Sequence, residues 1–149
     1  MQYKTGVRTS EEKMTDILRL QKEDIDISRL LAETRDDADG AQLVFVGTVR
    51  NDADSLSGLE IEAFVPAAEK DLSDIAREAE AKFGVRSVHI VHRYGYLSVG
   101  DVIVVTIICA AHRGEAYDAS RFVIEKIKEK VPIWKKEVLS NGKQGEWVH

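Results

Sequence analysis

Two lysines flank a proline near the C-terminus, with the spacing of an anion-binding or proton-transfer site. Lys128 lies in the last turn of a predicted helix that ends at Lys130, and Lys135 follows the break that Pro132 imposes. If the chain folds back after the break, each ammonium group lowers the pKa of the other. A lysine with a lowered pKa can act as acid, base or nucleophile near neutral pH. The alternative, that both lysines only complement the helix dipole in solvent, stays open at this point.

Two other groups of basic residues follow segments predicted to be strands. His112 and Arg113 come directly before a helix, where free backbone N–H groups and the helix dipole favour an anion. An imidazole and a guanidinium there would bind a phosphate or carboxylate, although both side chains are equally compatible with a solvated helix end. Arg50 ends another predicted strand, where its side chain can reach a cleft at the edge of a sheet.

The single cysteine and the neighbouring histidines do not indicate a thiol nucleophile or a metal centre. Cys109 lies in an apolar predicted strand, where a cysteine is usually a small core residue with a raised pKa. His89 and His92 lack further cysteines or carboxylates at the spacing of metal ligands. We therefore expect no metal site and no bound cofactor.

Composition and charge are those of an ordinary globular protein. The 149 residues are 44% hydrophobic and 32% charged, and no apolar run is long enough to span a membrane. The net charge of −5 disfavours nucleic acid as a partner, yet residues 117–149 hold seven basic and five acidic side chains, which suits a small anionic ligand. The N-terminus lacks the apolar core of a secretion signal, and one cysteine fits a reducing compartment, so we expect a cytoplasmic protein.

The hydrophobic pattern predicts one α+β domain over residues 15–149, after a loosely ordered extension over residues 1–14. Pro132 and Gly84 end two long predicted helices, and Asp26 is a plausible N-cap for a short one. The predicted helices cover residues 27–34, 67–83 and 114–130. The predicted strands cover residues 15–21, 42–49, 59–64, 87–93, 101–110, 133–138 and 146–148. The predicted loops include residues 51–58 and 94–100.

Several motifs along the chain resemble one family in their identity and order. The most specific are Ala111-His-Arg-Gly-Glu-Ala116, and Lys128 followed by Val131-Pro-Ile-Trp-Lys-Lys-Glu137. The other matches are Gly40-Ala41, Phe45-Val-Gly-Thr-Val-Arg50, Leu59-Glu-Ile-Glu-Ala-Phe64, His92-Arg-Tyr-Gly-Tyr-Leu-Ser-Val-Gly100 and Trp147-Val148. Together they resemble the MoaE family, the large catalytic subunit of molybdopterin synthase, over residues 15–148.

The resemblance implies an α/β-hammerhead fold, with a mixed sheet, packed helices and a small β subdomain. It also implies a homodimer that binds a small ubiquitin-like subunit at each end, giving a heterotetramer. The C-terminal Gly-Gly tail of that partner would carry a thiocarboxylate into a pocket of the large subunit. Its sulfur would pass to cyclic pyranopterin monophosphate, and two transfers would create the dithiolene of molybdopterin. The implied activity is a sulfurtransferase of molybdenum cofactor biosynthesis.

The resemblance also implies roles for the basic residues. Lys128 and Lys135 match the catalytic lysines of the family, and the anion-binding positions match Arg50, His112 and Arg113. We expect these groups to form one positive pocket, within a protomer or between two. As a hypothesis, Lys128 handles protons or engages the carbonyl of the tail, while Lys135 stabilises developing negative charge and holds the phosphate.

The narrow Gly-Gly tail needs a channel, which Pro132, Ile133 and Trp134 would wall. Core packing explains Trp134 equally well. Two other functions remain open on the sequence: a non-catalytic dimeric module that binds an anion or a partner's tail, and, less in keeping with the acidic composition, a nucleic-acid-binding protein. In a binding module, neutralising the lysines would change affinity only.

Overall fold

A four-stranded sheet forms the body of the molecule, in a computed structural model that describes residues 16–51 and 56–149. In spatial order its strands are β1 (Leu18–Gln21), β4 (Ser87–Arg93), β6 (Val102–Ala110) and β2 (Ala41–Thr48). β1 runs parallel to β4, whereas β6 is antiparallel to both β4 and β2. The predicted extension over residues 1–14 lies outside the described residues.

The two central strands are both buried, but they differ in composition. β6 is aliphatic over most of its length, the continuous apolar run expected of a strand that is covered on both faces. Every residue of β4 is buried as well, although four of its seven residues, Ser87, His89, His92 and Arg93, are polar or charged. Cys109 is fully buried in β6, and burial raises the pKa of its thiol. The predicted core position of this cysteine is confirmed.

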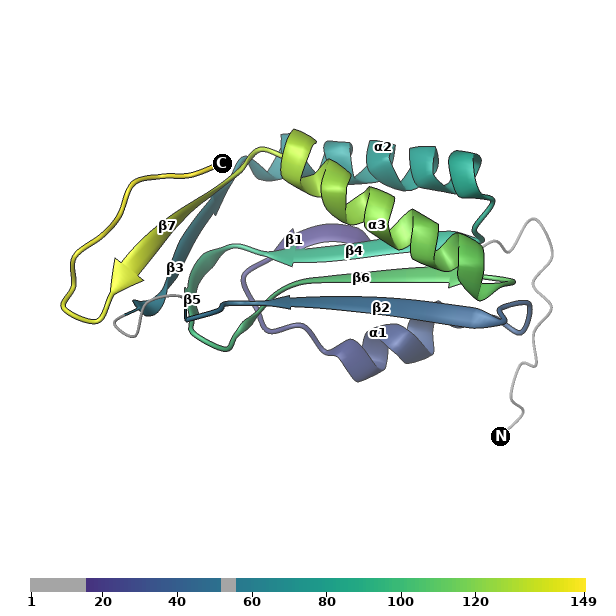
Figure 1. Ribbon diagram of the computed structural model, residues 1–149, viewed down its shortest axis with the longest axis horizontal. Helices are drawn as coiled ribbons and strands as arrows, with labels where there is room; N and C mark the ends of the chain where they lie inside the picture. Colours follow the sequence, from purple (N-terminus) through teal and green to yellow (C-terminus); the bar gives the residue numbers. More distant parts are fainter. Residues whose placement is uncertain (1–15, 52–55) are drawn as a thin grey trace.

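Helices cover both faces of this sheet (Figure 1). α2 (Val65–Phe83) and α3 (Arg113–Lys130) lie side by side on one face, and the short α1 (Ile27–Thr34) lies on the other. Gly84 ends α2 as predicted: its φ of 67° is the left-handed conformation that glycine adopts without strain. The buried stripe of α2 has helical spacing, and comprises Ala68, Leu72, Ile75, Ala76 and Ala79.

The second sheet is small and antiparallel, and it stands at one end of the first (Figure 1). In spatial order its strands are β5 (Gly95–Ser98), β3 (Leu56–Ala63) and β7 (Ile133–Leu139). β5 corrects the prediction of a loop over residues 94–100. Gly95, with φ 96°, precedes Leu97, which is fully buried and pairs with Leu59 of β3. This pairing partner is distant in sequence, so the local pattern of four residues does not signal it.

Two strand starts and one short predicted strand differ from the predictions by more than one residue. β3 begins at Leu56 rather than Leu59, because Leu56 is buried and pairs with Leu139 of β7. β1 begins at Leu18, later than predicted. The predicted strand over residues 146–148 is reduced to one bridge, in which Lys135 and Val148 exchange two backbone hydrogen bonds of 2.7 Å.

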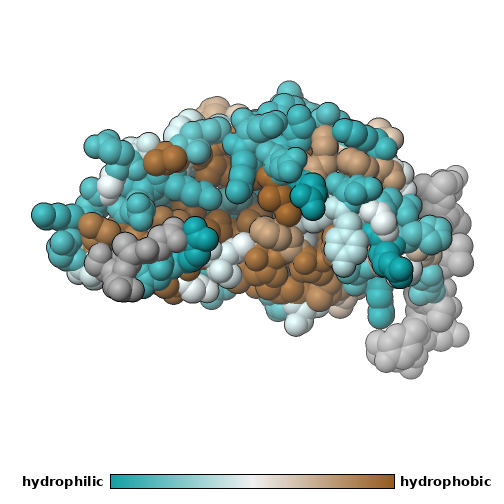
Figure 2. All heavy atoms as spheres, in the orientation of Figure 1, coloured by the Kyte–Doolittle hydropathy of each residue, from teal (hydrophilic) through white to brown (hydrophobic). Residues whose placement is uncertain are grey.

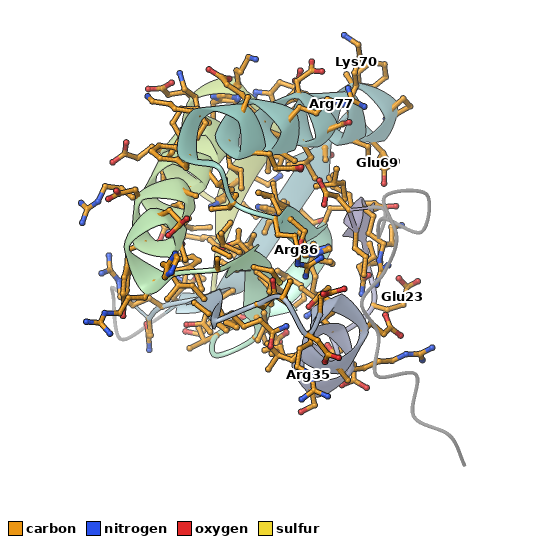
Figure 3. All side chains as sticks on the ribbon, turned by 90° about the vertical axis from the view of Figure 1, so that its right-hand side faces the viewer. Glu23, Arg35, Glu69, Lys70, Arg77 and Arg86 are labelled. Carbon is orange, nitrogen blue, oxygen red and sulfur yellow. The ribbon has the colours of Figure 1, made fainter. Side chains whose placement is uncertain are left out.

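A hydrogen-bonded network ties α1 to the sheet, at the end of the molecule where Figure 3 labels Arg86. Asp26 caps α1 as predicted, accepting a hydrogen bond from the backbone N–H of Arg29 at 3.1 Å. The Arg86 guanidinium donates to both carboxylate oxygens of Asp39, at 2.5 and 2.6 Å, and to the Thr34 carbonyl at 2.8 Å. These charges stabilise the fold.

Among the described residues, no helix is long and apolar enough to cross a bilayer.

Candidate active site

A pocket of about 220 Å³ lies between the four-stranded sheet and the C-terminal end of α3. Four strands and one helix contribute to it, so residues from most of the chain meet there. Its lining consists of Phe45, Gly47, Thr48, His92, Ile103, Val104, Thr106, Ile124, Ile127, Lys128 and Lys135. The two lysines that the sequence singles out therefore do share one cavity.

The break after α3 brings the two lysines together. The helix ends where Val131 adopts an extended conformation, with φ −79° and ψ 129°, before Pro132. The chain then enters β7, whose pairing with β3 sets Lys135 opposite Ile61. Lys128 is exposed on the last turn of α3, whereas Lys135 is half-buried. The pocket thus has a charged group at its mouth and a second one deeper inside.

Burial changes the chemistry of the deeper lysine. The pKa of Lys135 is lowered, chiefly because burial penalises the ammonium form and secondly because the charge of Lys128 repels it. His92 lies in the same lining and is neutral, since its pKa is lowered to about 4, chiefly by burial and to a smaller extent by the charge of Lys135. The pocket therefore holds an amine that gives up its proton more readily than a solvated lysine does.

His112 and Arg113 lie at the opposite end of α3 from the lysines. Arg113 is the first residue of the helix and Lys128 follows fifteen positions later, which corresponds to roughly 22 Å along the axis. The His112 side chain is 84% exposed, and its Nδ1 lies 3.5 Å from a carboxylate oxygen of Glu115. Within one protomer, then, these two residues do not share a pocket with the lysines.

Arg50 lies at the lysine end of the molecule. It follows Thr48, which lines the pocket, by two residues, and it is exposed. The intervening Val49 is buried, and its N–H donates to the carbonyl of Asp101 at 2.9 Å. Arg50 is therefore attached to a fixed strand end close to the pocket, although it is not among the lining residues.

The three residues predicted to wall a channel for a partner's tail have different surroundings. Ile133 is buried in the hydrophobic core, and Pro132 is half-buried and accepts a hydrogen bond from the Phe64 N–H at 3.3 Å. Trp134 is 38% exposed, and its ring centroid lies 5.8 Å from that of His149. Because successive residues of a strand face opposite sides, Trp134 points away from the pocket that Lys135 enters. Of the three, Trp134 has the largest accessible surface.

A second hollow, of about 380 Å³, lies beside the first between β2 and α3. Its lining residues are Leu43, Val44, Phe45, Tyr117, Ser120, Arg121, Ile124 and Glu125. Figure 2 shows an apolar patch over β2, and Phe45 and Val46 are 38% and 40% exposed. β2 is an edge strand, and among the described residues no strand pairs with its outer side.

Sequence reasoning missed two polar residues of the lysine pocket. His92 enters the sequence analysis only as an improbable metal ligand and as the start of a family motif, and Thr106 lies in the apolar strand predicted over residues 101–110. A polar residue within a strand that is otherwise aliphatic is the signal that could have drawn attention to Thr106. The position of both side chains under α3 depends on the pairing of β4 with β6, which the sequence does not specify.

Comparisons with known proteins agree with this architecture. The family model described as MoaE protein matches residues 20–130. The molybdopterin synthase catalytic subunit of Thermoplasma volcanium is 36% identical over 132 residues, 87% of this chain and 96% of the relative. That of Pasteurella multocida is 41% identical over 111 residues, 73% of each chain.

Solved structures show the same fold. The molybdopterin synthase structure from Staphylococcus aureus superposes with a TM-score of 0.84 at 35% identity, covering 91% of this chain and 99% of that one. A complex of subunits 1 and 2 of the molybdopterin-converting factor from Helicobacter pylori contains a chain that matches with a TM-score of 0.72 at 25% identity, covering 85% of this chain and 87% of that one. The predicted α+β class is confirmed, and the chain belongs to the MoaE family.

Proposed function

We infer that this chain is the catalytic subunit of a molybdopterin synthase, a sulfurtransferase of molybdenum cofactor biosynthesis. It takes sulfur from the C-terminal thiocarboxylate of a small ubiquitin-like subunit and adds it to cyclic pyranopterin monophosphate, making the dithiolene of molybdopterin. Membership of the MoaE family and the names of the relatives support this reaction. The observation that carries it is the pocket in which burial and Lys128 lower the pKa of Lys135. We place the reaction in the cytoplasm, where thiols stay reduced.

The reaction needs from this chain only positive charge and proton transfer, because the sulfur arrives on the partner. In each transfer the thiocarboxylate sulfur bonds to a carbon of the substrate, while a C–O bond at that carbon breaks and the oxygen leaves with a proton. Hydrolysis then breaks the bond between the sulfur and the tail carbonyl, so that the tail ends as a carboxylate and the sulfur stays on the substrate. The intermediate carries negative charge, which a cationic pocket stabilises. Cys109 takes no part, since its thiol is buried and its pKa is raised.

The burial of the two lysines favours a division of roles opposite to the one hypothesised from the sequence. Lys135 has the lowered pKa, so it is the better candidate to exchange protons with the reacting groups near neutral pH. Lys128 stands exposed at the mouth of the pocket, where an ammonium group can meet the incoming tail or the substrate phosphate. Together they provide one acid–base group and one fixed charge.

The proposed sulfur donor is a separate small subunit with a Gly-Gly C-terminus. The related Helicobacter pylori structure is a complex of two subunits, which supports a partner of this kind here. We propose that the tail approaches along the small sheet near Pro132, Ile133 and Trp134. Because Ile133 is buried and Trp134 faces the opposite side of β7 from Lys135, the tryptophan ring would contact the tail outside the pocket, before the tail turns into it.

A second copy of this chain would bring the remaining cationic residues to the pocket. The exposed apolar edge at Phe45 and Val46 suits an isologous contact between two β2 strands. A two-fold axis at the middle of β2 places the Ala41 end of one copy beside the Thr48 end of the other. α3 begins near the Ala41 end, because Ala41 pairs with Ala110 of β6. Arg113 of the partner subunit would then lie near the lysine pocket.

In this dimer His112 and Arg113 act across the interface, and Arg50 acts within its own protomer. The substrate phosphate would bind between them, since a guanidinium pairs well with phosphate oxygens and a helix N-terminus adds free N–H groups. The homodimer within a heterotetramer is thus what completes the site. Each end of the dimer would bind one small subunit.

The function is tested by reconstitution with a thiocarboxylated small subunit and cyclic pyranopterin monophosphate, followed by an assay for the dithiolene product. We expect product with the native chain and strongly reduced product with Lys128→Ala and Lys135→Ala, each shown to be folded. Normal turnover in both variants would overturn the catalytic role of the lysines. If the native chain binds both ligands but forms no product, it is the non-catalytic binding module instead.

A further inference from the structure

The inner end of the lysine pocket contains two polar groups that the proposed reaction does not yet use. They belong to His92 on β4 and Thr106 on β6, the two central strands of the sheet. In the register of these strands His92 pairs with Val104 and Ile90 pairs with Thr106, so both polar side chains lie on the face that α3 covers. His92 is 3% exposed and Thr106 is completely buried.

The hydrogen bond at one nitrogen of His92 determines what the other nitrogen offers. Nδ1 lies 2.7 Å from the carbonyl oxygen of Arg93, and since a carbonyl only accepts, Nδ1 carries the hydrogen. The imidazole is neutral because burial lowers its pKa to about 4. Nε2 therefore holds a lone pair, and it makes no hydrogen bond to any residue that the structure describes. It can only accept.

The hydroxyl group of Thr106 is also unused. It is buried, and within residues 16–51 and 56–149 it has no hydrogen-bond partner. A buried hydroxyl without a partner lowers stability, and a valine of the same shape would avoid that loss. A rotation about the Cα–Cβ bond exchanges the methyl and hydroxyl groups, so the oxygen can turn toward a polar group in the pocket.

His89 shows how the same strand satisfies a buried imidazole that has only a structural task. It lies three residues from His92 on the opposite face, and its pKa is likewise lowered to about 4 by burial. Its Nδ1 accepts a hydrogen bond from the Ile17 N–H at 2.9 Å, and its Nε2 lies 3.0 Å from the Ser87 hydroxyl. Both nitrogens of His89 are paired within the protein. His92 instead lines the pocket, and its Nε2 has no hydrogen-bond partner among the described residues.

We propose that His92 and Thr106 form a hydrogen-bonding subsite at the inner end of the lysine pocket for an uncharged O–H or N–H group of a ligand. The group must be a donor because Nε2 can only accept. It must be uncharged because the aliphatic side chains of Ile103, Ile124 and Ile127 disfavour an ion, and because the charge of Lys135 repels a cationic donor. This subsite deepens the proposed function and rests on it. Two ligands of the reaction carry such donors: the pterin substrate, in its ring N–H and O–H groups, and the partner's tail, in its backbone amides.

The test is titration calorimetry on the full-length dimer with two separate probes, cyclic pyranopterin monophosphate alone and the small subunit alone. We expect His92→Leu and Thr106→Val each to weaken binding of one probe by about tenfold, the effect of one lost hydrogen bond. His92→Gln, which keeps an acceptor, should recover most of the affinity. The matched control is His89→Leu, which removes a buried histidine from the same strand outside the pocket and should leave both affinities unchanged.

Thermal unfolding separates this role from a structural one. Thr106→Val should be at least as stable as the native chain, so weaker binding by that variant cannot come from unfolding. Loss of pterin affinity assigns the subsite to the substrate, and loss of small-subunit affinity assigns it to the tail. If the native chain binds both probes and both variants bind them equally well, the subsite is wrong while the proposed function stands. If the native chain binds neither probe, the subsite and the proposed function are both wrong.

Discussion

The two ends of α3 carry basic residues in opposite settings. At the N-terminal end His112 is 84% exposed, and its Nδ1 lies 3.5 Å from a carboxylate oxygen of Glu115 in the same helix. At the C-terminal end the chain breaks and returns as β7, so that Lys135 enters a pocket beside Lys128 and its pKa falls. An exposed cation can attract an anion, but water and salt screen its charge. A lysine that two elements hold in a partly buried pocket has a lowered pKa and can exchange protons more readily.

On the proposed function, this difference would also make one chain insufficient for the reaction. The N-terminal cluster is suited to binding a phosphate, and the C-terminal cluster to proton transfer, yet the helix holds them roughly 22 Å apart. A reaction on a phosphorylated substrate needs both. The antiparallel contact of two β2 strands would reverse one copy and join the two kinds of site.

The largest effect should come from the lysine that the pocket buries. Lys135→Ala should lower kcat by at least about 100-fold, the contribution of a general acid–base group. Lys136→Ala is the matched control, because Lys136 faces the other side of β7, with its ammonium 4.4 Å from the centroid of the Trp147 ring. Steady-state rates of dithiolene formation measure both. Equal losses in the two variants would mean that general positive charge, and not the buried amine, drives the reaction.

The proposal that the N-terminal end of α3 in one copy completes the lysine pocket of the other is tested by mixing inactive variants. Lys135→Ala and Arg113→Ala homodimers should both be nearly inactive. After subunit exchange, half of the dimers are mixed and each contains one intact site, so activity should rise to roughly a quarter of the native value. If both residues act within one protomer, no mixed dimer has an intact site and the activity stays low.

The smallest effect is on stability. In the unfolded chain the ammonium group of Lys135 is solvated, whereas folding buries it and penalises the charged form. Lys135→Met removes this penalty, so it should raise the midpoint of thermal unfolding by a few degrees. The penalty disappears only as the pH rises through the lowered pKa toward 10.5, the ordinary value for lysine. His112→Gln, at the exposed end, should leave the midpoint unchanged. Calorimetry at pH 7 compares the two, and a lower midpoint for Lys135→Met would contradict the burial penalty.

Much of the fold could be predicted from the sequence, because its signals are local. The stripe of α2, its glycine stop at Gly84, the N-cap Asp26 and the core position of Cys109 depend on neighbours in the chain. β5 could not be predicted, since a four-residue segment becomes a strand only through its pairing with β3. The local periodicity of apolar residues identifies single helices and strands, whereas the order of the strands in a sheet depends on pairing between residues far apart in the chain.

For the site, too, the sequence predicts the features that depend on local signals and not those that depend on strand pairing. Pro132 placed the break, and hence the approach of Lys135 to Lys128, correctly. A single pocket for all the cations does not form within one chain, because α3 separates the lysines from Arg113. The inner position of His92 follows from strand register, which spacing along the sequence does not determine.

The central claim is that Lys135 is held as a readily deprotonated amine by burial and by Lys128. Its direct test is a pH titration of the Lys135 side chain by heteronuclear NMR, in the ligand-free native dimer and in Lys128→Gln. The expected midpoint lies clearly below 10.5 in the native chain and moves upward in the variant, because a repelling charge is removed. A midpoint at 10.5 in both proteins would contradict the claim.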